Sequence, residues 1–169
     1  MREHLDELKS LLGPGRGVLE RRFLGRLRRL GYNPRERKAL AAIIPAAALA
    51  QAAEGLPAAF IEQAEYNGRR LAKMKVSPSR TIRALREFDH LVIPMVSAAD
   101  FKAQARYRRA LEQWYACVVL TLNNASYQVS EAEARAYHQL FSHQLEAGSL
   151  GDLMSRMLES LGQYCNAQE

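Results

Sequence analysis

Apolar residues recur along this chain at intervals of three and four, which is the spacing of α-helices with one buried face. No window alternates apolar and polar residues over a useful length, so no β-strand is expected. Glycines and prolines interrupt the pattern, and the expected helices cover residues 2–12, 18–30, 34–44, 57–75, 78–92, 97–124, 130–145 and 150–164. The sequence therefore predicts an all-α protein.

Several helix ends carry capping signals. Asn33 precedes Pro34, and Ser77 precedes Pro78, so each pair offers an N-cap followed by proline at the first helical position. Ser130 and Glu133 form a capping-box pattern, which predicts that a new helix opens there. Pro94 is expected to end the helix that begins at Pro78, because proline has no backbone donor. Pro45 either kinks its helix or starts another that ends near Glu54.

Two of the expected helices have long buried faces. In 57–75 this face holds Phe60, Ala64, Asn67, Leu71 and Met74. In 97–124 it holds Tyr107, Leu111, Trp114, Tyr115, Val118 and Leu122. Eight helical pieces, none of them long enough for a simple four-helix bundle, favour crossed-helix packing of the globin sort.

Composition fits a globular protein with a core, because 48% of the 169 residues are hydrophobic and 25% are charged. The two cysteines, Cys117 and Cys165, have neither disulfide-framework nor zinc spacing, so a reducing, cytoplasmic setting is expected. The start is charged and lacks an apolar leader segment. The most apolar stretch, 39–50, is shorter than the roughly 20 residues that cross a membrane.

The net charge of +6 is uneven, with +9 in residues 1–85 and −3 in residues 86–169. A cluster of arginines accounts for much of it: Arg21, Arg22, Arg26, Arg28 and Arg29. A nucleic-acid site would need interleaved aromatic residues or a helix-turn-helix partner, and neither is evident. A solvated helix face is therefore the favoured interpretation, with no specific nucleic acid as a partner.

Motifs for catalysis and metal binding are missing from the sequence. His138 and His143 are five residues apart, which does not place two ligands on one helix face. There is no nucleophile elbow and no phosphate-binding loop, since the glycine-rich run 13–17 lacks the required lysine and the preceding strand. We therefore expect neither an enzyme nor a metal site.

One segment carries a resemblance. Residues 66–78, Tyr-Asn-Gly-Arg-Arg-Leu-Ala-Lys-Met-Lys-Val-Ser-Pro, resemble the turn between helices F and G of bacterial sensor globins. The likeness is to the non-haem globin domains at the front of stressosome co-antagonist proteins and of related histidine kinases. Residues 57–75, 78–92 and 97–124 then correspond to helices F, G and H. The resemblance implies a globin-like crossed-helix fold with C-terminal extension helices, and a sensory and dimerisation role in bacterial signal transduction.

The same resemblance bears on the cofactor. Haem-binding sensor globins carry a proximal histidine about two turns before the proline of this turn, and alignment on Pro78 places Leu71 there. The resemblance therefore implies no haem. A haem-based gas sensor, with His90 as the nearest candidate ligand, is one alternative, and a purely structural dimerisation module is another.

Some relatives hold a fatty acid or another small apolar ligand in the emptied haem pocket. The corresponding pocket walls here are Phe60, Leu71, Leu85, Trp114 and Val118. Ala48 and Ala52 would form a facing wall of small residues. Because protein interiors are close-packed, we expect this wall to close onto its neighbours and leave only a modest cavity.

The C-terminal segment is expected to form a signalling helix. Leu150, Leu153, Met157 and Leu161 recur about every 3.5 residues, which suits a dimeric coiled coil. Residues 149–167 resemble the helix that enters a GAF domain in multi-domain kinases. The expected organisation is a globin-like sensor domain over 1–147, a linker helix over 148–169 toward a fused output domain, and a parallel homodimer.

Overall fold

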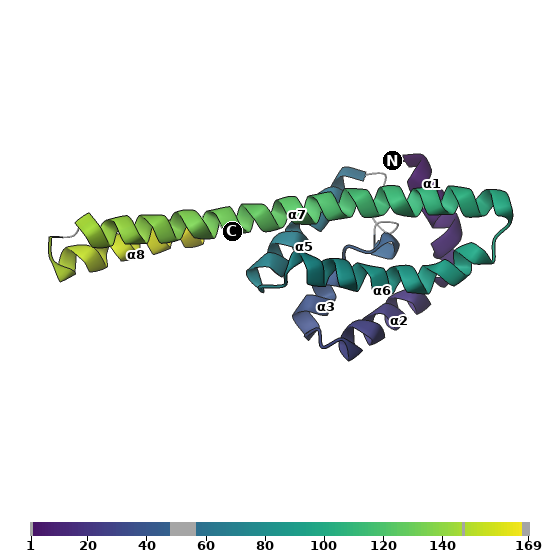
Figure 1. The fold of residues 1–169 in the computed structure, drawn as a ribbon, viewed down its shortest axis with the longest axis horizontal. Coiled ribbons are helices and arrows are strands. Elements are labelled where there is room, and N and C mark those ends of the chain that lie inside the picture. The colour runs from purple at the N-terminus through teal and green to yellow at the C-terminus, as the bar shows by residue number, and fades with distance from the viewer. Residues whose placement is uncertain (1, 48–56, 147, 167–169) are drawn as a thin grey trace. The chain divides into compact units, whose positions relative to one another are not determined.

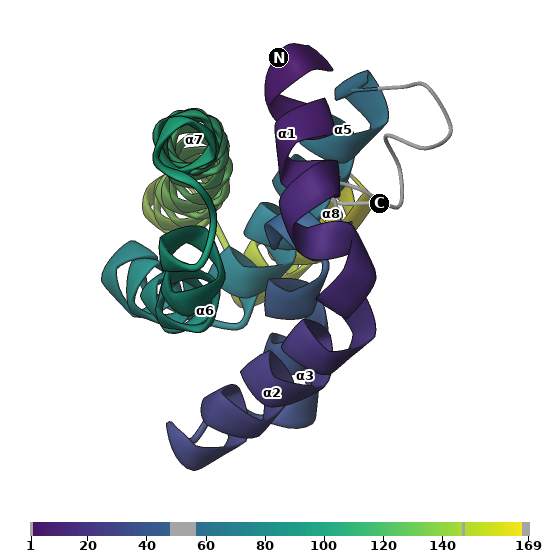
Figure 2. The ribbon, with the colours of Figure 1, turned by 90° about the vertical axis from the view of Figure 1, so that its right-hand side faces the viewer.

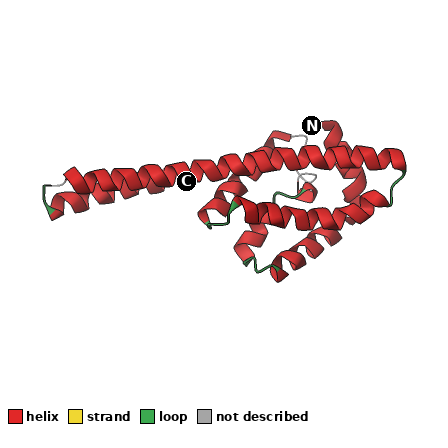
Figure 3. Ribbon diagram, in the orientation of Figure 1, coloured by secondary structure: helices red, strands yellow, loops and turns green. Residues whose placement is uncertain are grey.

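The computed structural model describes residues 2–47, 57–146 and 148–166, and every regular element in these ranges is a helix (Figure 1, Figure 3). The helices are α1 (Arg2–Leu12), η1 (Gly13–Gly15), α2 (Arg16–Arg29), α3 (Pro34–Ala41), α5 (Pro57–Lys73), α6 (Pro78–Ser97), α7 (Phe101–Glu146) and α8 (Leu150–Asn166). The predicted all-α class is confirmed. Within these ranges, no helix is both long and apolar enough to span a membrane.

The chain divides into two compact units, residues 1–126 and 127–169. The division falls inside α7, which runs through both units. The sequence-based boundary after residue 147 lies within the second unit and stays a prediction. The first unit holds 22 of the 24 basic residues, and the second carries two basic and six acidic ones.

The first unit is built around one hydrophobic core to which α1, α2, α3, α5, α6 and the first part of α7 all contribute. Helices α2 and α6 pack together, and the ring of Phe23 meets the ring of Phe88 edge-on with centroids 5.5 Å apart. Beside this contact, Arg26 pairs with Glu87 at 2.9 Å. Helix α6 and the first part of α7 lie side by side (Figure 1, Figure 2).

The predicted caps of α3 and α6 are present. The backbone N–H of Glu36 donates to Asn33 Oδ1, and the N–H of Asn33 donates to Glu36 Oε2, both at 2.9 Å. Ser77 Oγ accepts from the N–H of Arg80 at 3.3 Å. These contacts satisfy backbone donors that the first turn of each helix leaves open.

The turn between α5 and α6 is a Schellman motif. The N–H of Val76 donates to the carbonyl of Leu71 at 3.0 Å, and the N–H of Lys75 donates to that of Ala72 at 2.8 Å. Lys75 has φ of 59°, in the left-handed region that a glycine usually fills. Gly31, with φ of 78°, closes α2 in the same way. The break between α5 and α6 therefore lies where the sequence predicted it.

Two predicted helix boundaries are wrong. Pro94 lies inside α6, which continues to Ser97, and Pro94 is on the exposed face, where water can solvate the carbonyl that its missing N–H leaves unbonded. Ser130 and Glu133 do not open a helix, because α7 is continuous from Phe101 to Glu146. No glycine or proline occurs over that range to stop it. The helix expected to end near Glu54 lies mostly outside the described residues.

The second unit is a helical hairpin in which α8 runs back along the end of α7 (Figure 1). His143 Nε2 and Ser160 Oγ are 2.7 Å apart across it. The predicted coiled-coil stripe of α8 is split between two faces. Leu153 and Met157 are half-buried and Ser160 is buried, whereas Leu150 and Leu161 are exposed. The apolar arc of α8 is therefore wider than a single seam.

Candidate ligand-binding core

The five residues predicted to line a ligand pocket all lie in the core of the first unit. Helix α5 contributes Phe60 and Leu71, α6 contributes Leu85, and α7 contributes Trp114 and Val118, and none is more than 6% exposed. Three helices that are separate in the sequence thus bring their apolar faces into one cluster. The facing wall, Ala48 and Ala52, lies outside the described residues. The role of these five side chains in ligand binding stays a prediction.

The core is tightly packed at the Leu71 end. Leu71 lines a cavity of only about 10 Å³, together with Gly68, Val76, Val119 and Leu122. A space of this size holds about one water molecule. Around Leu71, a larger ligand would therefore need the helices to move apart.

The Trp114 end differs, because it contains a buried polar atom without a partner. The indole ring lies 6.5 Å from the ring of Phe60 and 4.8 Å from that of Tyr115. Trp114 is 4% exposed, and its Nε1–H meets no hydrogen-bond acceptor in the structure as described. Leaving such a donor unpaired costs about 1–3 kcal/mol. An apolar molecule with one acceptor atom would remove this cost.

Tyr115 is anchored beside the indole. Its hydroxyl donates to the carbonyl of Leu85 at 3.1 Å, which ties α7 to α6. Burial, and to a lesser extent the nearby Asp89 carboxylate, raise the pKa of this phenol, so it stays protonated and remains a donor. The contact holds the Trp114–Tyr115 pair in place on α7.

Asp89 lies in a groove of about 320 Å³ between α6 and α7, with Ile93, Arg108 and Tyr115 among its lining residues. Burial raises the pKa of this carboxyl, and the neighbouring His90 opposes the shift. Asp89 was not predicted from the sequence as a site residue. The sequence signal that could have indicated partial burial of Asp89 was its place directly after Phe88, which belongs to the buried face of the helix.

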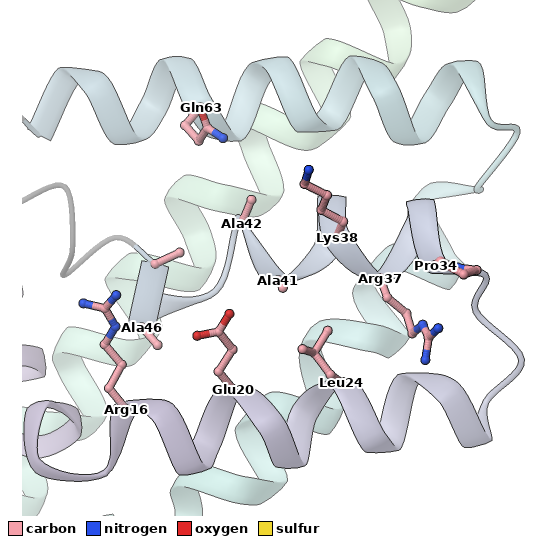
Figure 4. Close-up of a pocket in the computed structure, with 11 residues that line it drawn as sticks. Arg16, Glu20, Leu24, Pro34, Arg37, Lys38, Ala41, Ala42, Ala46 and Gln63 are labelled. Atoms are coloured by element: carbon pink, nitrogen blue, oxygen red, sulfur yellow. The ribbon is translucent and has the colours of Figure 1, made fainter.

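A larger groove of about 640 Å³ lies elsewhere, between α2, α3 and α5 (Figure 4). The carboxylate of Glu20 points into it, and Leu24, Ala41 and Gln63 line it. None of the five predicted pocket residues belongs to it. It extends past the end of α3 to Ala46 and Ala47.

The candidate haem ligand is not in the core. His90 is exposed on the face of α6 that also carries exposed Arg83 and Arg86. Among the described residues, no group of three or more His, Cys, Asp or Glu side chains is arranged to hold a metal ion.

The arginine cluster of α2 is a solvent-facing surface. Arg21, Arg22, Arg28 and Arg29 are exposed, while Arg26 pairs with Glu87. No acidic residue shares the exposed face, since Glu20, the one acid of α2, is half-buried in the larger groove. A basic helix face of this kind binds anions through charge alone, without base contacts.

Comparison with known proteins adds no assignment to this geometry. No family model, curated protein or solved structure matches the chain.

Proposed function

We propose that this chain is the homodimeric sensory domain of a bacterial signal-transduction protein, of the histidine kinase type. In this proposal the first unit has globin-like packing without haem. Its core takes a small apolar ligand with one hydrogen-bond acceptor, and the C-terminal helices pass the signal to a fused output domain in the cytoplasm. It is not an enzyme, and it has no specific nucleic-acid partner.

The observation that carries this proposal is the unpaired donor of Trp114. Phe60 and Val118, like Trp114, belong to the buried cluster that the resemblance identifies as the emptied haem pocket. A buried donor surrounded by apolar side chains supplies one directional contact, which is how apolar ligand sites fix orientation. A fatty acid in its protonated, uncharged form, with its carboxyl oxygen as acceptor, has the required chemistry.

The tight packing at Leu71 favours a second candidate, a structural dimerisation module without a ligand. A cavity of about 10 Å³ leaves no room for a chain of methylene groups at that end. The two candidates differ in one measurable respect, because only the sensor binds an apolar molecule stoichiometrically.

Trp114 is the single tryptophan of the chain, so its fluorescence reports on the candidate site alone. The experiment titrates the protein, stripped of co-purified lipid, with dodecanoate and hexadecanoate. The sensor reading predicts a saturable change in emission at a ratio of one ligand per chain. No saturable change, and no lipid in the extract of purified protein, would leave the structural module as the function.

A matched pair of variants measures the contribution of the indole donor. Trp114→Phe keeps an aromatic ring and removes the donor, and calorimetric titration should show binding weakened by roughly 5–10-fold. Tyr127→Phe, at an exposed position outside this core, should bind like the wild type. Equal affinity in all three proteins would show that the ligand does not pair with Trp114.

A further inference from the structure

The helical hairpin of the second unit has an unusually apolar exposed surface. Its exposed large hydrophobic side chains are Tyr127, Tyr137, Phe141, Leu150, Met154, Leu158 and Leu161, each between 42% and 76% exposed. Three come from α7 and four from α8. A hairpin of two helices buries only one strip of each helix, so this surface needs a separate explanation.

The exposed side chains form one stripe on each helix. Successive residues of an α-helix are turned by about 100°, so Leu150, Met154, Leu158 and Leu161 fall within a sector of about 80°. Tyr127, Tyr137 and Phe141 fall within a sector of similar width on α7. The charged residues of the described part of the hairpin all lie outside these two sectors.

Both stripes lie on the same side of the hairpin. On α8, the half-buried or buried residues Leu153, Met157 and Ser160 face α7. Around the axis of α8, the exposed stripe is offset from this buried face in the same sense as the 100° turn from each residue to the next. On α7, the half-buried residues Ala136, Leu140 and His143 mark the buried face. The exposed stripe of α7 is offset from that face in the same sense around the helix axis as on α8. Because the two helices run in opposite directions, equal rotations bring both stripes to one face.

We infer that this face pairs with the same face of a second copy of the chain, so that two hairpins form a four-helix bundle. Each helix of such a bundle needs two apolar strips, one for each neighbour, and α7 and α8 each have two. A two-fold axis brings a surface against itself, and a stripe on both helices makes the surface self-complementary.

The exposed area fits this partner. The seven side chains offer on the order of 700 Å² of apolar surface per hairpin. A stable interface of standard size buries about 800 Å² per partner. A second copy therefore covers the face without any other partner. The inference rests on the proposed homodimer and is independent of the proposed ligand.

The first test is the mass of the purified chain in solution, measured by light scattering over a range of micromolar concentrations. The wild type should have twice the chain mass of 19.0 kDa. Met154→Glu combined with Leu158→Glu places two charges in the stripe and should raise the dissociation constant by roughly 100-fold or more. The control, Ser155→Glu with Gln163→Glu, adds the same charge at exposed positions outside the stripe and should remain a dimer.

A milder variant decides the matter if the charged one fails to fold. Two single-cysteine variants are reacted with a maleimide. One carries Met154→Cys and the other Gln163→Cys, and in both chains Cys117 and Cys165 are replaced by serine. Both positions are exposed in the single chain. In the dimer, the cysteine at 154 should react more slowly than the one at 163, and the protection should disappear on dilution.

The results that overturn the inference are specific. They are a wild type with the mass of one chain, a dimer that persists unchanged in the Met154→Glu, Leu158→Glu variant, or equal maleimide rates at both positions. A monomer that still binds dodecanoate would overturn this inference and leave the ligand proposal intact. A dimer that binds neither fatty acid would leave this inference intact and overturn the ligand proposal.

Discussion

Gly68 of α5 lies against Ala125 of α7 so closely that a Cβ at position 68 would be 2.9 Å from the Cβ of Ala125. The same Cβ would be 3.1 Å from Leu122 Cδ2. Glycine weakens a helix interior by about 0.5–1 kcal/mol relative to alanine, so its place in α5 serves the close approach of two helices.

Gly68→Ala should therefore destabilise the protein by about 1–3 kcal/mol, because the added methyl overpacks the contact with α7. Urea denaturation followed by circular dichroism measures this difference. The control is Gly25→Ala in α2, where an added Cβ meets nothing within 4 Å, and this variant should be neutral or more stable. A Gly68→Ala protein as stable as the Gly25→Ala protein would contradict the close packing.

The cap of α3 can be tested by Asn33→Ala. This change removes the acceptor for the N–H of Glu36 and should lower the free energy of unfolding by about 1 kcal/mol. Asn124→Ala, at an exposed position within α7, removes the same amide and should be neutral or slightly stabilising. Equal effects of the two changes would mean that the capping box contributes nothing.

The carboxyl of Asp89 should make the free energy of unfolding depend on pH. Burial raises the pKa of its carboxyl above the unfolded value of 3.8, so folding favours the protonated form. Stability from this group is therefore present below that pH and is lost as the pH rises through the raised folded pKa. Asp89→Asn should be more stable than the wild type at neutral pH, and the difference should shrink as the pH falls through the raised folded pKa toward 3.8. Urea unfolding of both proteins from acidic to neutral pH gives the comparison, and a constant difference would contradict the assignment.

Haem addition tests the cofactor directly. Leu71, which the resemblance aligns with the proximal ligand, is buried, and His90 is exposed, so stoichiometric haem should give no sharp Soret band. The measurement is an absorption spectrum of wild type and His90→Ala. A tight complex whose band is lost in His90→Ala would establish the haem sensor instead.

Local signals in the sequence placed several elements correctly. The Asn33–Glu36 box, Ser77 with Pro78, and the buried faces of α5 and α7 were all predicted, because caps and helical periodicity depend on residues within one or two turns. The cluster of Phe60, Leu71, Leu85, Trp114 and Val118 is buried as an apolar set should be. A ligand-binding role for this cluster is still a prediction that rests on the resemblance, because such a role depends on tertiary geometry.

The two wrong boundaries show where local signals are insufficient. A proline inside a helix removes one backbone hydrogen bond, and Pro94 lies on an exposed face of α6 where water can bond the freed carbonyl. A capping pattern opens a helix only if the preceding residues leave the helical conformation, and none of the residues before Ser130 forces α7 to do so. Both outcomes depend on surroundings that lie outside the local pattern.

By itself, the sequence determined that the chain is helical, where most of its helices begin, and which faces are apolar, because these follow from backbone propensity and the period of the pattern. Only the tertiary structure decided how those faces are used. It divided the arc of α8 into Leu153 and Met157 toward α7 and Met154 and Leu158 toward solvent, and it buried the indole N–H of Trp114 without an acceptor among the described residues. The physical reason is that the burial and hydrogen bonding of a side chain depend on which surfaces meet in the folded protein. The residue pattern of one helix does not specify which other helices pack against it.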